Sequence, residues 1–140
     1  MKIKYSPSIP KWKITLFEQA FGDASKFIRK KYKLSLIAFH DLLKGYVIKI
    51  NPKQKPSIYI EGKLITIAGD RWNFIYLYER KSIGNYHRVN KVSHHHGFAS
   101  QLIHELTHLI QHIEKRKYSE VETTRNEIEY LESQNYKVFI

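Results

Sequence analysis

Three histidines and a glutamate fall within the segment SQLIHELTHLIQH, which runs from Ser100 to His112. His104, Glu105 and His108 form the pattern H-E-x-x-H. On a helix, side chains four residues apart share one face about 6 Å apart along the axis, so two imidazoles can converge on one metal ion. Glu105 can reach a water on that ion without being a ligand, as a general base does. The pattern predicts a zinc site with a catalytic base.

The same segment also fits an ordinary amphipathic helix. Seven apolar residues lie on the face opposite the histidines: Ala99, Leu102, Ile103, Leu106, Leu109, Ile110 and Ile113. In an isolated helix the histidine face would then lie in water. His112 lies about 12 Å along the axis from His104, so these two and His108 cannot share one ion. A metal site therefore needs a third ligand from another element.

Downstream of His112, the composition restricts that third ligand to one of six glutamates: Glu114, Glu120, Glu122, Glu127, Glu129 and Glu132. The chain has no cysteine, which excludes thiolate ligands and disulfides, and neither histidine nor aspartate follows His112. A helix is expected at about 119–133, because Ser119 and Glu122 form an S-x-x-E capping box. Glu122 and Glu129 point away from the apolar stripe of that helix. Three glutamates flank the stripe and remain open as ligands: Glu120, Glu127 and Glu132.

The spacing resembles that of the gluzincins, zinc metallopeptidases whose third ligand is a glutamate on a helix after H-E-x-x-H. A common spacing in that family leaves eighteen residues between the second histidine and this glutamate, as between His108 and Glu127 here. The pair Asn126-Glu127 is also similar to a dipeptide common there. The resemblance covers about 104–132. It implies that His104, His108 and Glu127 bind Zn²⁺ with Glu105 as the base, in a minimal, minigluzincin-like domain.

The chain departs from the gluzincin pattern in two respects. Thermolysin-like relatives carry an aspartate four residues after the ligand glutamate, where this chain has Leu131. No later histidine can stabilise a transition state, so the candidate donors are Tyr118, Tyr130 and the His94–His96 cluster. Three consecutive histidines cannot all face one ion in regular structure, and these are expected in a loop or helix cap. These two departures affect the expected catalytic rate more than the expected binding of the metal.

Two helical regions flank a region of strands. Apolar residues recur at helical spacing over about 10–32, and again over about 97–116 before the helix at 119–133. The order helix, sheet, helix, helix predicts an α+β fold, and the resemblance makes it zincin-like. We expect one domain over residues 1–140.

Strands are expected in the middle of the chain, where short runs rich in Ile, Tyr and Val are divided by Gly, Pro and Asn. The segments concerned are 45–50, 57–69 and 71–80, with 85–92 either a strand or a loop. Together they predict a small, mostly antiparallel sheet. The segment 71–80, RWNFIYLYER, is the candidate edge strand for pairing with an extended peptide substrate.

The apolar C-terminal residues YKVFI allow three arrangements. They pack on the core, add a strand to the sheet, or lie in the cleft and block it.

The net charge of +11 is unevenly distributed. Residues 1–93 carry 19 Lys/Arg against 6 Asp/Glu, a net charge of +13, whereas residues 94–140 carry 5 against 7, a net of −2. Such a basic region attracts nucleic acid, or is simply a solvated lysine-rich surface. No RNP-type signature, GxxG loop or zinc-finger spacing accompanies it.

The sequence has no membrane or export signal of the usual kind. No apolar run approaches the ~20 residues of a membrane span, and no apolar stretch follows the basic start. A cytoplasmic protein is expected.

Three functions follow as hypotheses. The first is a zinc-dependent peptidase, in which Glu105 takes a proton from a metal-activated water that attacks a peptide bond. The second is a nucleic-acid-associated basic protein, either a metalloprotease acting near DNA or a binder without chemistry. The third is a zinc-stabilised domain without catalysis.

Overall fold

The computed structural model describes residues 1–51, 55–68, 74–78, 86–90 and 92–139. Along the chain the elements are β1 (Lys2–Tyr5), α1 (Lys11–Tyr32), α2 (Leu36–Leu42), β2 (Val47–Asn51), β3 (Ser57–Tyr59), β4 (Leu64–Ala68), β5 (Phe74–Tyr78), β6 (Tyr86–Asn90), α3 (His94–Ile113), α4 (Glu120–Ser133) and β7 (Val138–Phe139). The order confirms an α+β architecture.

The larger sheet has four strands in the order β1-β2-β4-β3. Strands β1, β2 and β4 are parallel, and only β3 is antiparallel to its neighbour β4. The expectation of a mostly antiparallel sheet is therefore wrong for this sheet, which is mixed. The physical reason is that α1 and α2 form a crossover between β1 and β2, which brings the chain back in the same direction. Neither β1 nor α2 was predicted from the sequence.

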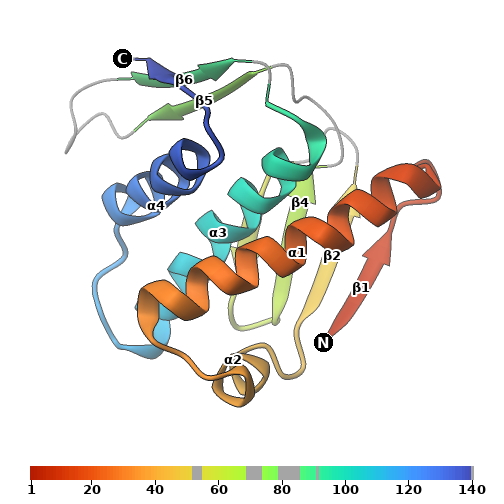
Figure 1. Cartoon of the computed structure of the whole chain (residues 1–140). Helices are drawn as coiled ribbons and strands as arrows, with labels where there is room; N and C mark the ends of the chain where they lie inside the picture. Colours follow the sequence, from red (N-terminus) through yellow and green to blue (C-terminus); the bar gives the residue numbers. More distant parts are fainter. Residues whose placement is uncertain (52–54, 69–73, 79–85, 91, 140) are drawn as a thin grey trace.

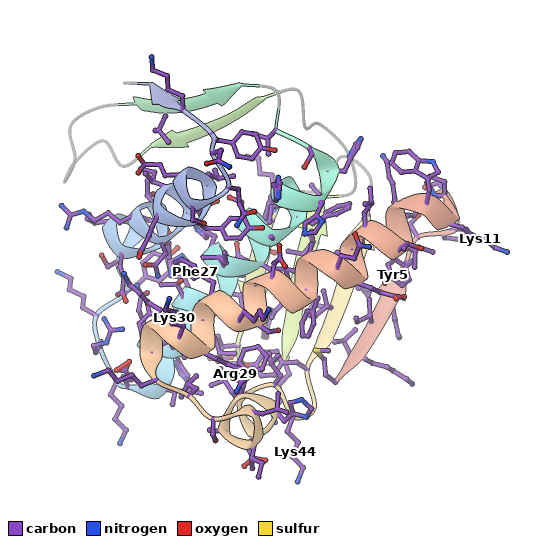
Figure 2. The ribbon with its side chains drawn as sticks, in the orientation of Figure 1. Tyr5, Lys11, Phe27, Arg29, Lys30 and Lys44 are labelled. Atoms are coloured by element: carbon purple, nitrogen blue, oxygen red, sulfur yellow. The ribbon has the colours of Figure 1, made fainter. Side chains whose placement is uncertain are left out.

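Helices cover one face of this sheet. In Figure 1, α1 and α3 lie over β1, β2 and β4. The inward isoleucines of β2 and β4 are fully or almost fully buried: Ile48, Ile50, Ile65 and Ile67. Above them the ring of Phe17 on α1 packs edge-on against Phe98 on α3, with centroids 5.5 Å apart. Phe27 of α1, which is labelled in Figure 2, packs edge-on against Tyr130 of α4.

The two C-terminal helices begin where side chains cap them. The α3 helix begins at His94, three residues before the expected start, because Ser93 Oγ accepts a hydrogen bond from the backbone N–H of His96. The α4 helix begins at Glu120, and Ser119 Oγ accepts from the N–H of Glu122, as the capping box predicted. The histidine run therefore forms the first turn of α3.

The C-terminal tail belongs to a second, antiparallel sheet in the order β5-β6-β7. Strand β5 confirms the central part of the expected strand 71–80, whose ends lie outside the described residues, and β6 shows that 86–90, within the segment 85–92, form a strand. Residues Val138 and Phe139 pair with β6, and Figure 1 shows this pairing beside the C-terminus. Two of the three arrangements considered for the tail are found together, because Val138 pairs with β6 while Tyr136 and Val138 also pack against the core.

We expect deletion of residues 136–140 to lower the free energy of unfolding by about 2 kcal/mol without raising any hydrolytic activity. The deletion removes the half-buried Tyr136, whose hydroxyl accepts from the N–H of Ser93, and the β7 pairing. Urea unfolding measures the loss, with Glu132→Gln, an exposed change on α4, as the control. A gain in peptide hydrolysis after deletion would mean that the tail covers the site.

Candidate metal centre

The histidine face of α3 is covered by α4 and by the residues before it. The side chain of His108 is only 3% exposed and that of His104 is 22% exposed. The ring of Tyr118 stacks on His108 with centroids 4.1 Å apart and planes 6° from parallel. The reading of this face as solvent-exposed is therefore wrong for these two histidines, whereas His112 is exposed, in line with its exclusion as a ligand.

Glu120 brings a carboxylate to both imidazoles. Its Oε1 lies 2.8 Å from Nε2 of His108, and its Oε2 lies 3.4 Å from Nε2 of His104. One ligand atom from each of the three residues lies within 4.8 Å of the others. Nε2 of His108 is buried yet makes no hydrogen bond of normal geometry, even to the nearby Glu120. The three groups thus point towards a common position, as metal ligands do.

Glu127 lies on the other side of His104. Its Oε2 is 2.8 Å from Nδ1 of His104, and its Oε1 accepts a hydrogen bond of 2.8 Å from Ser100 Oγ. The two nitrogens of an imidazole point in divergent directions, so a carboxylate at Nδ1 cannot share an ion bound at Nε2. In the structure Glu120, and not the Glu127 that the resemblance implied, lies at the Nε2 atoms of both imidazoles, whereas Glu127 contacts the other nitrogen of His104. A carboxylate at that second nitrogen orients the ring.

Gln111 orients the other histidine. Its Oε1 lies 3.0 Å from Nδ1 of His108 and also accepts from the N–H of Ser119. Its amide nitrogen donates to the Ser119 carbonyl, which ties this contact to the start of α4. This role of Gln111 was not predicted from the sequence. The available signal was its place three residues after His108, on the same face of the helix.

Glu105 is buried beside the two histidines, with 4% of its surface exposed. Burial raises its pKa to about 7, although the positive charge that His104 and His108 can carry acts to lower it. A carboxyl group with a pKa near 7 suits a general base at neutral pH. The structure thus places the expected base against the expected histidines.

The carboxylates around His104 favour its positive form. Burial acts to lower the pKa of this imidazole, but Glu127 and Glu120 outweigh burial and raise the pKa to about 11. The close imidazoles of His104 and His108 in turn hold the pKa of Glu120 well below its usual range. Glu105, Glu120 and Glu127 therefore surround two imidazoles, and the centre attracts positive charge. A metal ion that binds here displaces protons.

A groove of about 640 Å³ lies beside His108. It is lined by one side of α3, by the residues that follow it and by residues 58–61, which include the end of β3: Ile58, Tyr59, Ile60, Glu61, His108, Gln111, His112, Arg116 and Tyr118. Strand β3 is an edge of the larger sheet. The segment 71–80 was expected to be the strand edge beside the histidines. In the structure β3 has this position, whereas β5, the described part of 71–80, belongs to the second sheet.

Of the candidate donors named from the sequence, only Tyr118 lies at the centre. Its hydroxyl donates to Glu120 while its ring covers His108. The hydroxyl of Tyr130 instead donates to Asp23 Oδ2 at 3.1 Å. The residues His94–His96 form the first turn of α3, about three to four turns before His108.

Comparison with models of known families, with curated proteins and with solved structures found no significant match. None of the helices in the described residues is long and apolar enough to cross a membrane. The function is therefore inferred from the geometry of the centre.

We expect Glu105→Gln to stabilise the metal-free protein at pH 8 by about 3 kcal/mol. This is the free energy that corresponds to the rise in the pKa of Glu105 from 4.5 to about 7. The raised pKa means that the protonated carboxyl stabilises the fold. This stability is fully present below pH 4.5, the usual pKa of a glutamate, and is lost as the pH rises through about 7. Glutamine is neutral at every pH, so the variant should become more stable than the parent chain as the pH rises from 4.5 to about 7. Below pH 4.5 this difference in stability should vanish.

Urea unfolding at a series of pH values, with a chelator present, measures this difference. Glu129→Gln is the matched control, because Glu129 is exposed on α4. Equal stability of the parent and Glu105→Gln at pH 8 would contradict the effect of burial on Glu105.

Proposed function

We propose that the chain is a zinc-dependent peptidase whose ligands are His104, His108 and Glu120. The convergence of these three groups, with Nε2 of His108 buried and lacking a hydrogen bond, is the observation that carries the proposal. Two imidazoles and one carboxylate are a known ligand set of catalytic zinc sites, which keep one position open. The absence of cysteine is consistent with this set.

The chain's own residues account for the remaining requirements of hydrolysis. Zn²⁺, when bound, supplies a Lewis acid and lowers the pKa of a coordinated water towards ~7. Glu105, buried beside both histidines and with its pKa raised, accepts the proton of the attacking water. Glu127 and Gln111 hold the two imidazoles by their Nδ1 atoms, which leaves Nε2 of each ring for the ion.

The groove beside His108 favours an extended peptide as the substrate. In the described part of the chain, β3 has β4 on one side and no strand on the other. Its free edge can therefore pair with a peptide backbone. Tyr118 is the residue best placed to donate a hydrogen bond to the developing oxyanion, once its hydroxyl leaves Glu120.

Exchange of single carboxylates on α4 tests the ligand assignment. We expect Glu120→Gln to lower the affinity for Zn²⁺ by at least a hundredfold, because it removes a ligand. Glu127→Gln should lower it by roughly 10- to 100-fold, because only the orientation of His104 suffers. Glu129→Gln, which is exposed, should leave it unchanged. Competition with a chromophoric chelator measures each affinity.

The activity is tested with a degenerate peptide mixture read out by mass spectrometry. The parent chain should cleave peptides, and Glu105→Gln should retain Zn²⁺ but lose cleavage, since it lacks the base. If Glu127→Gln weakens metal binding more than Glu120→Gln, the ligand assignment is reversed. Zinc binding without cleavage of any peptide would favour the zinc-stabilised domain without catalysis.

A second candidate function, binding of single-stranded nucleic acid, rests on the outer face of the larger sheet. The register places Lys4 directly beside Lys49. Both are exposed, as is Lys2, and they lie on the face opposite the helices. Tyr59 of β3 is 57% exposed and lies in the same lateral row as Lys2. Val47 and Leu64 lie between Lys2 and Tyr59 in that row, so the ring is at the opposite edge of the sheet from β1. Lysines and an exposed aromatic ring spread across one sheet suit the phosphates and a stacked base of a single strand.

We expect the double change Lys4→Gln/Lys49→Gln to weaken binding of a single-stranded oligonucleotide. Loss of two phosphate contacts should also reduce the slope of log K against log salt concentration by about 1.4. Fluorescence anisotropy at several salt concentrations measures both effects. Lys26→Gln/Lys30→Gln is the matched control, because it removes the same charge from the exposed side of α1 (Figure 2 labels Lys30). Equal losses of affinity in the two double variants would mean that the oligonucleotide is held only by nonspecific attraction to the positive charge of the chain.

A further inference from the structure

A second group of metal-ligating side chains lies at the start of α3. Asp23 comes from the middle of α1, and His95 and His96 come from the first turn of α3. Nε2 of His95 is 2.8 Å from Oδ2 of Asp23, and the rings of the two histidines lie 4.9 Å apart. One ligand atom from each residue lies within 4.8 Å of the others. Within the described residues, only this group and the candidate centre gather three such atoms.

The two groups cannot share an ion. His95 precedes His104 by nine residues of continuous helix, which corresponds to about 13 Å along the axis. The group at Asp23 is therefore independent of the candidate centre.

The side chains of this group are held in place by neighbouring hydroxyls. Tyr130 of α4 donates a hydrogen bond to Oδ2 of Asp23 at 3.1 Å. The hydroxyl of Tyr136, in the tail, lies 2.8 Å from Nδ1 of His96, and Ser93 Oγ lies 3.1 Å from the same nitrogen. Such outer contacts orient the carboxylates and imidazoles that bind metal ions in proteins.

We propose that Asp23, His95 and His96 form a second site for a divalent transition-metal ion, with Zn²⁺ as the ion that suits it. Two imidazoles with one carboxylate are richer in nitrogen than the all-oxygen sites of Ca²⁺ and Mg²⁺. All three residues are half-buried, which leaves space for a solvent ligand in the fourth position. An ion here joins α1 to the start of α3.

This placement gives the site a structural role. Its ligands join two helices that are far apart in sequence, and the hydroxyls of Tyr130 and Tyr136 extend the connection to α4 and the tail. An ion that binds only the folded chain stabilises it in proportion to the logarithm of the ion concentration. The site therefore fixes the N-terminal end of the helix that carries His104 and His108.

Zinc stoichiometry of the tag-free protein tests this proposal directly. We expect the parent chain to bind two equivalents of Zn²⁺ and Asp23→Asn to bind one. Asparagine has nearly the shape of aspartate and still accepts from Tyr130, so the fold should be retained. His40→Ala, on the exposed side of α2, should still bind two. Isothermal titration with Zn²⁺ alone, together with elemental analysis after gel filtration, measures the equivalents.

A second background separates this site from the candidate centre. In His104→Ala/His108→Ala, one equivalent should remain, and it should weaken at least tenfold when Asp23→Asn or His96→Ala is added. Zn²⁺ should raise the Tm of the background variant and have no such effect after Asp23→Asn. This result does not depend on whether the chain cleaves peptides.

Loss of all Zn²⁺ binding in the His104→Ala/His108→Ala background would overturn the proposal. So would a second equivalent that survives both Asp23→Asn and His96→Ala, because the ion would then lie elsewhere. If Asp23→Asn lowers stability equally with and without Zn²⁺ and leaves the stoichiometry at two, Asp23 and His95 form only an ion pair. Circular dichroism confirms that each variant is folded, and His95→Gln serves in place of any variant that is not.

Discussion

Burial of α3 on almost every side is the constraint on which the rest of the structure depends. From Gly97 to Gln111, every residue of this helix except His104 is buried. The apolar residues meet α1 and the sheet, but the polar ones also need partners, because an unpaired buried polar group is costly. Gln101 pairs with both backbone groups of Ala68 on β4, and Thr107 accepts from Asn126 on α4. Each polar side chain thus binds α3 to a particular neighbour.

Helix α4 supplies the partners for the histidine face. Glu120 and Glu127 are seven residues apart, close to two full turns, so both carboxylates lie on one side of α4. Their carboxylates contact the two nitrogens of the His104 imidazole, Glu120 at Nε2 and Glu127 at Nδ1. Asn126 sets the distance between the helices by donating to Tyr32 on α1 as well as to Thr107 on α3. The geometry of the centre therefore follows from the contact between three helices.

The centre departs from the rule that buried polar groups are satisfied. Nε2 of His108 is buried without a hydrogen bond, and Glu105 is buried where its charge is disfavoured. Elsewhere on the same helix, Ser100, Gln101, Thr107 and Gln111 all have partners. Proteins tend to concentrate such unsatisfied groups where they bind or react, since the surrounding fold offsets the cost. Between Ser100 and Gln111 of α3, the groups with a buried polar cost are therefore those of the candidate centre.

The sequence by itself determined the local features: α1, the common helical face of His104 and His108, the capped start of α4 and the strand-rich middle. Each follows from spacing within about ten residues. Only the tertiary structure decided which glutamate faces both imidazoles, because Glu120 and Glu127 flank the same stripe of α4. Their roles depend on how far α4 lies along α3, which the distant contacts of Asn126 set. Sheet direction and the position of the tail were likewise decided by the crossover through α1 and by pairing with β6, which are contacts between residues far apart in the chain.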